Sequence, residues 1–239
     1  MTDGHDFPWK IVLFASMVSL NRRRWESMTK MKRVLAIGAH YDDVELGCGG
    51  TLLKHVQNGD PVYVLVITDS AYTDANGILI RDTKTAYEEG QKAARLMNVE
   101  MDCLNYKTFE VPFDEGLTRL IIRYIQERNI DTVYTHWVRD VHRDHQYAAR
   151  CTLMAARHVP NILMYRSNFY NADQPFLGTL YSDISHFMEK KCEVIRAYTS
   201  ELTRVNYAWL DFVRKRNSSD GQIVGVEYAE NFEITQYMI

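Results

Sequence analysis

Short apolar runs alternate along this chain with longer stretches in which apolar residues recur at helical spacing. The runs typical of buried strands are 34–37, 62–68, 101–104, 131–135, 161–165 and 179–182. Between them, helical spacing predicts helices at 51–56, 83–97, 114–128, 146–157, 183–197 and 205–216. We expect a turn at 217–221, and the tail reads as irregular structure or one strand. The pattern predicts an α/β fold: a single Rossmann-like domain whose mostly parallel sheet is flanked by helices.

The composition agrees with one such domain. At 239 residues, 46% of them apolar and 25% charged, the chain can bury a sizeable core. A net charge of −3 gives no indication of binding to nucleic acid or to an anionic membrane surface. The four cysteines are widely spaced and form no CxxC pair, so neither disulfides nor a thiolate zinc site is indicated. We therefore expect a reducing, cytoplasmic setting.

The first thirty residues differ from the rest, and we treat them as an extension that precedes a domain at 31–239. The run 11–18 is apolar but too short to span a bilayer, so we expect no transmembrane segment. A secretory signal would carry its positive charge before this run, whereas the arginines at 22–24 follow it. An added helix, an amphipathic anchor and an upstream start codon stay open as interpretations.

Two polar clusters carry the candidate chemistry. His40-Tyr41-Asp42-Asp43-Val44-Glu45 follows the strand at 34–37, and His142-Arg143-Asp144-His145 follows the strand at 131–135. Parallel strands bring their carboxyl ends to one edge of a sheet, where open α/β sheets build their sites. We therefore expect the two clusters to meet, although about a hundred positions separate them.

These residue types fit a metal site with an open position for water. His40, Asp43 and His145 would supply a histidine, a carboxylate and a second histidine, as in catalytic zinc sites. Zinc is favoured over magnesium because imidazole outnumbers carboxylate, although other divalent first-row metals such as ferrous iron or cobalt accept the same ligands.

The neighbouring residues are candidates for proton transfer. Asp42 points differently along the loop from the ligand beside it, so it is free to accept a proton from the attacking water as general base. His142 shares a helix face with His145 and can donate to the developing oxyanion. Asp144 suits a hydrogen bond that fixes a histidine tautomer. We expect Asp144 to hold His142 protonated, so that His142 sets the alkaline limb of the pH profile.

Two polar segments that follow other strands are expected to wall the substrate pocket. The stretch 69–82 reads as a long surface loop, and 166–178 follows the strand at 161–165. Arg81 and Asn168 within them are candidate substrate-binding residues. The histidines at 5, 55, 136, 158 and 186 are assigned no role, as ordinary surface or half-buried residues. Gly47, Gly49 and Gly50 do not match GxGxxG, and close backbone packing at a helix start explains them better.

Taken together, the motifs resemble those of the PIG-L/LmbE family of zinc-dependent N-deacetylases. That family's signature is a His-Pro-Asp-Asp-x-Glu loop after the first strand and a downstream His-x-Asp-His. The likeness covers about residues 32–198 and includes Leu46-Gly47-Cys48-Gly49-Gly50-Thr51-Leu52, Glu88-Glu89 with Ala93, and Asp183-Ile184-Ser185 with Lys190 or Lys191. Known members remove acetyl groups from glucosamine-containing lipids, thiols, oligosaccharides and antibiotics.

The resemblance implies that His40, Asp43 and His145 bind zinc and that Asp42 is the general base. It implies that His142 stabilises the tetrahedral intermediate or protonates the amine. Two departures leave the substrate open. Tyr41 replaces the usual proline, which loosens the loop or adds a hydroxyl near the substrate. Ala86 stands where many members carry a substrate-binding arginine, for which Arg81 is the available substitute.

We therefore predict an enzyme that removes the N-acetyl group from an amino sugar or glycoconjugate, such as an antibiotic or glycan precursor. The expected partner is a small acetylated sugar, and a homo-oligomer stays open. The alternatives are a metallo-amidase or phosphoesterase that acts on a non-sugar, and a non-catalytic sugar-binding module. The binding module is disfavoured because Asp42 is retained, which binding alone does not require.

Overall fold

The computed structural model describes residues 31–238, and the predicted extension at 1–30 lies outside them. The strands are β1 (Val34–Gly38), β2 (Val62–Thr68), β3 (Tyr72–Thr73), β4 (Leu79–Arg81), β5 (Glu100–Tyr106), β6 (Thr132–His136), β7 (Asn161–Tyr165), β8 (Leu180–Asp183) and β9 (Ala229–Gln236). The helices are α2 (Asp43–Gln57), α3 (Thr83–Met97), α4 (Glu115–Glu127), α5 (Arg143–Ala155), α6 (Met188–Ile195), α7 (Thr199–Arg204) and α8 (Ala208–Val224). The predicted α/β alternation is confirmed.

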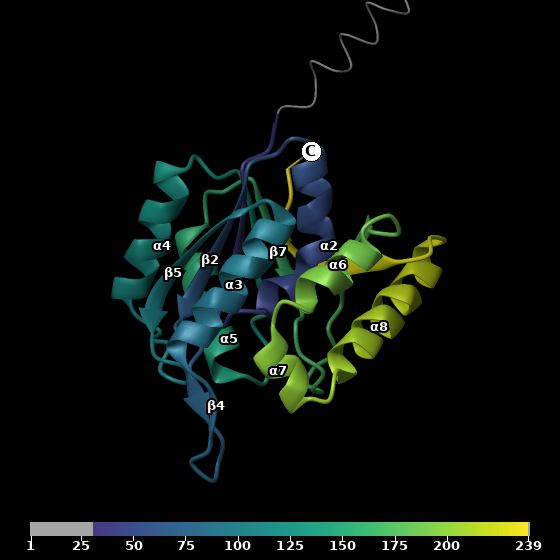
Figure 1. Cartoon of the computed structure of the whole chain (residues 1–239). Helices are drawn as coiled ribbons and strands as arrows, with labels where there is room; N and C mark the ends of the chain where they lie inside the picture. Colours follow the sequence, from purple (N-terminus) through teal and green to yellow (C-terminus); the bar gives the residue numbers. More distant parts are fainter. Residues whose placement is uncertain (1–30, 239) are drawn as a thin grey trace, which may run out of the picture. The chain divides into compact units, whose positions relative to one another are not determined.

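A seven-stranded sheet in the order β5-β2-β1-β6-β7-β9-β8 forms the centre of the domain (Figure 1). The five strands from β5 to β7 in this order pair in parallel, and β9 pairs antiparallel with β7 and β8. The chain passes from β1 through β2 to β5 and then returns to β6 on the other side of β1. The topological switch point of the sheet therefore lies between β1 and β6, the strands that precede the two polar clusters.

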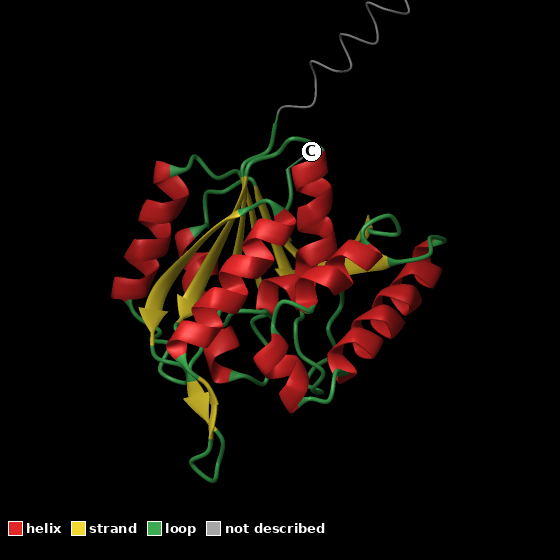
Figure 2. Ribbon diagram, viewed as in Figure 1, coloured by secondary structure: helices red, strands yellow, loops and turns green. Residues whose placement is uncertain are grey.

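Helices cover both faces of the sheet (Figure 2), so every residue of β1 is buried. Val34 and Ala36 belong to the apolar cluster shared with α2 and α3, whereas Leu35 and Ile37 belong to the cluster shared with α4 and α5. Because helices cover both faces, this strand appears in the sequence as an uninterrupted apolar run.

Helix α2 begins at Asp43, inside the first polar cluster and earlier than predicted. Its glycines permit close packing: a Cβ atom on Gly47 would lie 2.1 Å from the Tyr165 ring, and one on Gly50 would lie 2.9 Å from Ile184. This agrees with the packing role expected for them. Helix α5 likewise begins earlier than predicted, at Arg143, so His145 lies within its first turn.

The C-terminal part departs most from the prediction. The helix expected from 183 begins only at Met188, α7 was not predicted, and α8 runs through the turn expected at 217–221. Tertiary contacts stabilise α8 there, since the buried Asn217 donates to the Ala229 carbonyl at 2.9 Å and accepts from Lys191 at 3.1 Å. The expected loop at 69–82 contains the β3–β4 hairpin. Within residues 31–238, no helix is long and apolar enough to cross a membrane.

Candidate active site

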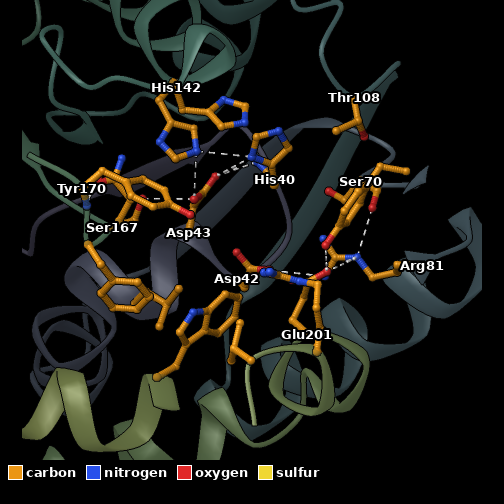
Figure 3. Close-up of a pocket in the computed structure, with 18 of the residues that line it drawn as sticks. His40, Asp42, Asp43, Ser70, Arg81, Thr108, His142, Ser167, Tyr170 and Glu201 are labelled. Carbon is orange, nitrogen blue, oxygen red and sulfur yellow. Dashed lines mark hydrogen bonds and ion pairs between the residues drawn. The ribbon is translucent and has the colours of Figure 1, made fainter. Parts of the chain in front are cut away.

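The first polar cluster turns sharply from β1 into α2. Asp42 has φ 102° and ψ −28°, a conformation that residues other than glycine seldom adopt and that tends to occur at functional sites. Asp43 follows as the first residue of α2, and its Oδ2 accepts the His40 backbone N–H at 2.7 Å. As expected, the two adjacent carboxylates point to different partners, as Figure 3 shows.

The three predicted metal ligands meet at the switch point of the sheet. His145 Nε2 lies 3.2 Å from Asp43 Oδ1, His40 Nδ1 lies 3.3 Å from Asp43 Oδ2, and the two nitrogens lie 3.3 Å apart. A tetrahedral ion with bonds of about 2.0 Å separates neighbouring ligand atoms by about 3.3 Å. Each histidine nitrogen thus lies at about a zinc-ligand separation from the other nitrogen and from one oxygen of Asp43, so the three side chains could share a zinc ion.

Hydrogen bonds to the far sides of the two rings assign their tautomers. Asp144 Oδ2 lies 3.0 Å from His40 Nε2, and Asp140 Oδ2 lies 3.1 Å from His145 Nδ1. Each carboxylate accepts the ring proton on its side, which leaves the lone pairs of His40 Nδ1 and His145 Nε2 facing Asp43. Lone pairs of two imidazoles and a carboxylate in such proximity require a cation between them.

The pKa shifts of Asp43 and His145 also show that a positive charge is favoured between these residues. Burial opposes the charge on Asp43, yet His145 and His136 hold the pKa of its carboxyl well below its usual range. Burial also opposes a proton on His145, but Asp43 and Asp140 raise the pKa of its ring to about 10. Without a metal, a proton on His145 is the cation that the carboxylates retain.

Two further histidines lie close enough to compete as ligands. Among the described residues, two sets of three donors have their ligand atoms within 4.8 Å of one another: His40, His142 and His145, and Asp43, His136 and His145. His142 Nδ1 accepts the Asp144 backbone N–H at 3.2 Å, so a neutral His142 carries its proton on Nε2. His136 Nε2 accepts the Ala39 backbone N–H at 2.9 Å. Neither ring has a free lone pair for a metal, which favours the predicted set.

His136, to which the sequence assigned no role, is buried beneath the site. It ends β6, its Nε2 lies 3.2 Å from Asp43 Oδ2, and its ring stacks on His145 with centroids 4.0 Å apart. The expectation that it is a surface or half-buried residue is therefore wrong. Its position at the carboxyl end of a strand beside the switch point was the signal that could have identified it. Asp140 and Ser167, which bond to His145 and Asp43, were also missed.

Asp42 faces a buried arginine instead of the histidines. Its Oδ2 lies 3.2 Å from Arg81 Nη1, and Arg81 Nε donates to the Ser70 carbonyl at 3.0 Å and lies 3.7 Å from Glu201. Burial raises the pKa of Asp42 well above its usual range, although the charge of Arg81 opposes this rise. Arg81, expected to bind substrate, is thus occupied by protein groups and holds the carboxylate expected to act as base.

The expectation that Asp144 holds His142 protonated is wrong. The Asp144 carboxylate bonds to His40 and accepts the Phe109 backbone N–H at 2.7 Å. His142 caps α5 through Nδ1, and burial together with repulsion from His145 and His40 lowers the pKa of its ring to about 4. His142 is therefore neutral at neutral pH and lines the cavity with its Nε2–H available to donate.

A cavity of about 290 Å³ opens beside these residues (Figure 3). Both segments expected to wall it do so, with Ser70, Tyr72 and Arg81 from the first and residues 167–170 from the second. Residues of α7, α8 and the turn between them also line it: Glu201, Arg204, Val205 and Trp209. Asn168 lines the cavity, but its side-chain amide donates to Asp140. It therefore also positions the partner of His145.

The two departures from the family motif lie in the core. Tyr41 is 2% exposed, and a Cβ on Gly90 would lie 2.2 Å from its ring, so the glycine of α3 makes room for the tyrosine. Its backbone N–H donates to Ser70 Oγ at 2.9 Å, which ties the loop down. Ala86 is fully buried in the same apolar cluster. Tyr41 therefore neither loosens the loop nor places its hydroxyl in the cavity.

Comparison with known proteins agrees with this geometry. A family model described as GlcNAc-PI de-N-acetylase, PIG-L, matches residues 35–156, which contain both polar clusters. The chain is 31% identical over 148 residues to the uncharacterized deacetylase YaiS of Escherichia coli (strain K12), covering 59% of this chain and 77% of that protein. It is 25% identical over 226 residues to the diacetylchitobiose deacetylase of Thermococcus kodakarensis, covering 86% and 84%. The solved N,N'-diacetylchitobiose deacetylase of Pyrococcus horikoshii shares the fold with a TM-score of 0.75 at 21% identity, over 98% of this chain and 95% of that one.

Proposed function

We propose, from the premise that this chain belongs to the PIG-L family of de-N-acetylases, that it is a metal-dependent hydrolase of N-acetylated amino sugars. The resemblance found in the sequence is thereby confirmed at the level of the family. One observation carries the proposal for this chain: His40, Asp43 and His145 present their lone pairs at the ligand separations of zinc, beside the carboxylate of Asp42 and in the wall of one cavity.

The metal, for which zinc is our proposal, would be held by His40, Asp43 and His145, and when bound it polarises the amide carbonyl and acidifies the attacking water. Asp42 accepts the proton of that water as it adds to the carbonyl carbon. The raised pKa of this carboxyl makes it a stronger proton acceptor than an ordinary aspartate. Arg81 fixes its orientation through the 3.2 Å contact.

The remaining steps also use groups that face the cavity. His142 donates its Nε2–H to the carbonyl oxygen as that oxygen gains charge. When the C–N bond breaks, Asp42 returns its proton to the nitrogen, which leaves as the free amine, and the acetic acid that forms passes its remaining proton to the amine or to solvent to give acetate. Ser167 Oγ donates to Asp43 Oδ1 at 3.0 Å and holds the ligand carboxylate in place.

The substrate class follows from the relatives and not from the fold, since one fold can host several reactions. The family model is described by a glucosamine-containing substrate, and the Thermococcus relative is named for diacetylchitobiose. We therefore propose an N-acetylglucosamine unit as the group that enters the cavity.

A panel assay tests this function. Purified protein is incubated with N-acetylglucosamine, diacetylchitobiose, acetylated sugar nucleotides and acetylated aminoglycosides, and the released primary amine is measured before chelation, after chelation and after zinc is restored. We expect amine release that chelation abolishes and zinc restores, and about one zinc per chain by elemental analysis. Sugar binding without amine release would indicate a binding module. Amine release only from non-sugar amides would indicate an amidase.

A further inference from the structure

The segment after β7 supports the metal site although it has no regular secondary structure. Ser167 Oγ donates to Asp43 Oδ1 at 3.0 Å, and the Asn168 side-chain amide donates to Asp140 Oδ1. Asp140 in turn holds His145 through its other oxygen, at 3.1 Å. Two consecutive side chains of one loop thus restrain one proposed ligand directly and a second ligand through Asp140.

An arginine of α8 fixes the backbone of this segment on both sides of Ser167. Arg216 Nη1 donates to the Arg166 carbonyl at 2.8 Å, and Nη2 donates to the Asn168 carbonyl at 3.0 Å. A planar guanidinium suits this two-pronged contact, because both donors lie in one rigid plane. One turn earlier in α8, Phe212 packs edge-on against Phe169 with centroids 3.9 Å apart. Helix α8 therefore holds residues 166–169 at two points.

The two carbonyls are the main hydrogen-bond partners of the Arg216 guanidinium. Burial and the nearby charge of Arg166 lower the pKa of Arg216 to about 9. Within residues 31–238 no carboxylate forms an ion pair with it, and its Nε has no hydrogen-bond partner. By contrast Arg214, on the same helix, forms a two-pronged ion pair with the exposed Glu189 at 2.6 and 2.7 Å. The half-buried guanidinium of Arg216 is thus held by two backbone carbonyls of the loop and, in the described part of the chain, by no carboxylate.

We propose that Arg216 is a positioning residue of the metal site. By holding the carbonyls of Arg166 and Asn168, it keeps Ser167 against Asp43 and Asn168 against Asp140, and it thereby strengthens metal binding. Arg216 does not itself line the cavity, so it acts through the loop and not on the substrate. This inference rests on the proposed function, because it presupposes a metal held by His40, Asp43 and His145.

Zinc affinity of the chelator-stripped protein tests the inference without any substrate. Competition with a chromophoric zinc chelator gives the dissociation constant for the wild type and for Arg216→Ala, Arg216→Lys and Arg214→Ala. Loss of partners behind metal ligands typically weakens binding about 10- to 100-fold, so we expect at least about a 10-fold loss in Arg216→Ala. Arg216→Lys can reach one carbonyl and should lose less. Arg214→Ala removes an ion pair from the same helix and should bind zinc like the wild type.

A double-mutant cycle with Ser167→Ala distinguishes action through the loop from general destabilisation. If Arg216 acts through Ser167 and Asn168, the double variant should lose less affinity than the product of the two single losses. Multiplicative losses, or wild-type zinc affinity in a folded Arg216→Ala protein, would overturn the inference alone. If Arg216→Ala does not fold, the same comparison of zinc affinities is made with Arg216→Lys, alone and in combination with Ser167→Ala. Failure of the wild type to bind zinc would overturn the proposed function as well.

Discussion

Asp42 and Asp43 are adjacent in the chain, yet Asp43 Oδ1 lies 3.2 Å from His145 Nε2 while Asp42 Oδ2 lies 3.2 Å from Arg81 Nη1. The positive φ of Asp42 separates the two carboxylates. In the proposed mechanism this dipeptide supplies both a metal ligand and the general base, and each carboxylate can be replaced without the other.

Replacement of Asp42 by Asn should abolish proton transfer and spare the metal. The amide keeps the shape and a hydrogen-bonding oxygen but does not accept the proton of water at neutral pH. General-base catalysis contributes about 10²–10⁴-fold, so we expect kcat to fall in that range with zinc content unchanged. Asp43→Asn is the matched control, because it should lose zinc together with turnover. Near wild-type kcat in zinc-loaded Asp42→Asn would refute the assignment of the base.

Replacement of Asp144 by Asn should weaken metal binding instead of shifting a pH limb. Its carboxylate accepts from His40 Nε2 at 3.0 Å and fixes the tautomer that would present Nδ1 to the proposed metal. Loss of such a partner typically costs about 10- to 100-fold in metal affinity. Chelator competition on Asp144→Asn and the wild type measures the effect. Unchanged zinc affinity combined with a shifted alkaline limb would restore the original assignment of Asp144 to His142.

His142→Ala should lower kcat and leave the alkaline limb of the pH profile in place. The pKa of His142 is lowered to about 4, so the ring is neutral across the neutral and alkaline range and does not titrate there. Its contribution is a neutral Nε2–H donor, and removal of one such donor costs about 10²–10³-fold in kcat. Profiles of kcat against pH for both proteins check this. An alkaline limb that disappears in His142→Ala would contradict it.

Arg81→Ala should reduce kcat more than it raises KM, because the guanidinium of Arg81 pairs with Asp42 and Glu201. Arg204→Ala is the control, since Arg204 also lines the cavity and pairs with Glu201 but does not contact Asp42. Partial recovery of Arg81→Ala by added guanidinium would support a positioning role. A change confined to KM would support the original assignment of Arg81 to substrate binding.

The fold could be predicted from the sequence because it depends on local hydrophobic patterns. The meeting of the two polar clusters could be predicted because each cluster follows a strand of the same parallel sheet. A strand buried on both faces is an apolar run, and parallel strands bring their ends to one edge. Which side chains form hydrogen bonds with one another at that edge could not be predicted, because this depends on how α5 is oriented relative to the end of β1. For this reason Asp144 was assigned to His142 when it bonds to His40.

Long-range contacts explain the other errors. His136 begins the histidine-rich stretch 136–145 but lies six positions before His142, and only the pairing of β6 beside β1 brings it to Asp43. The residues at 217–221 have the composition of a turn, but Asn217 bonds to both Lys191 and Ala229 in the interior and the helix continues. Turn propensity is a weak local preference that such buried bonds override.

The fold should depend on a buried ion pair that joins α6 to β9. Lys191 Nζ lies 2.7 Å from Glu230 Oε1, and both residues are 1% exposed. Glu230 also accepts the backbone N–H groups of Gly50 and Thr51 at 2.9 and 2.7 Å, which ties β9 to α2. Removing one member leaves an uncompensated buried charge, so Glu230→Ala should lower the free energy of unfolding by about 3–5 kcal/mol.

Urea unfolding of three further variants separates the charge effect from lost packing. The double variant Lys191→Met with Glu230→Leu removes both charges and keeps apolar volume, so it should be less destabilised than Glu230→Ala, although the N–H groups of Gly50 and Thr51 lose their acceptor. Lys191→Met alone should be destabilised because it leaves the Glu230 carboxylate buried without its cation. Lys215→Ala removes a surface ion pair between Lys215, whose side chain is 76% exposed, and Asp211, whose side chain is 68% exposed. This variant should unfold like the wild type. A double variant less stable than both single variants would show that the charges themselves stabilise the fold.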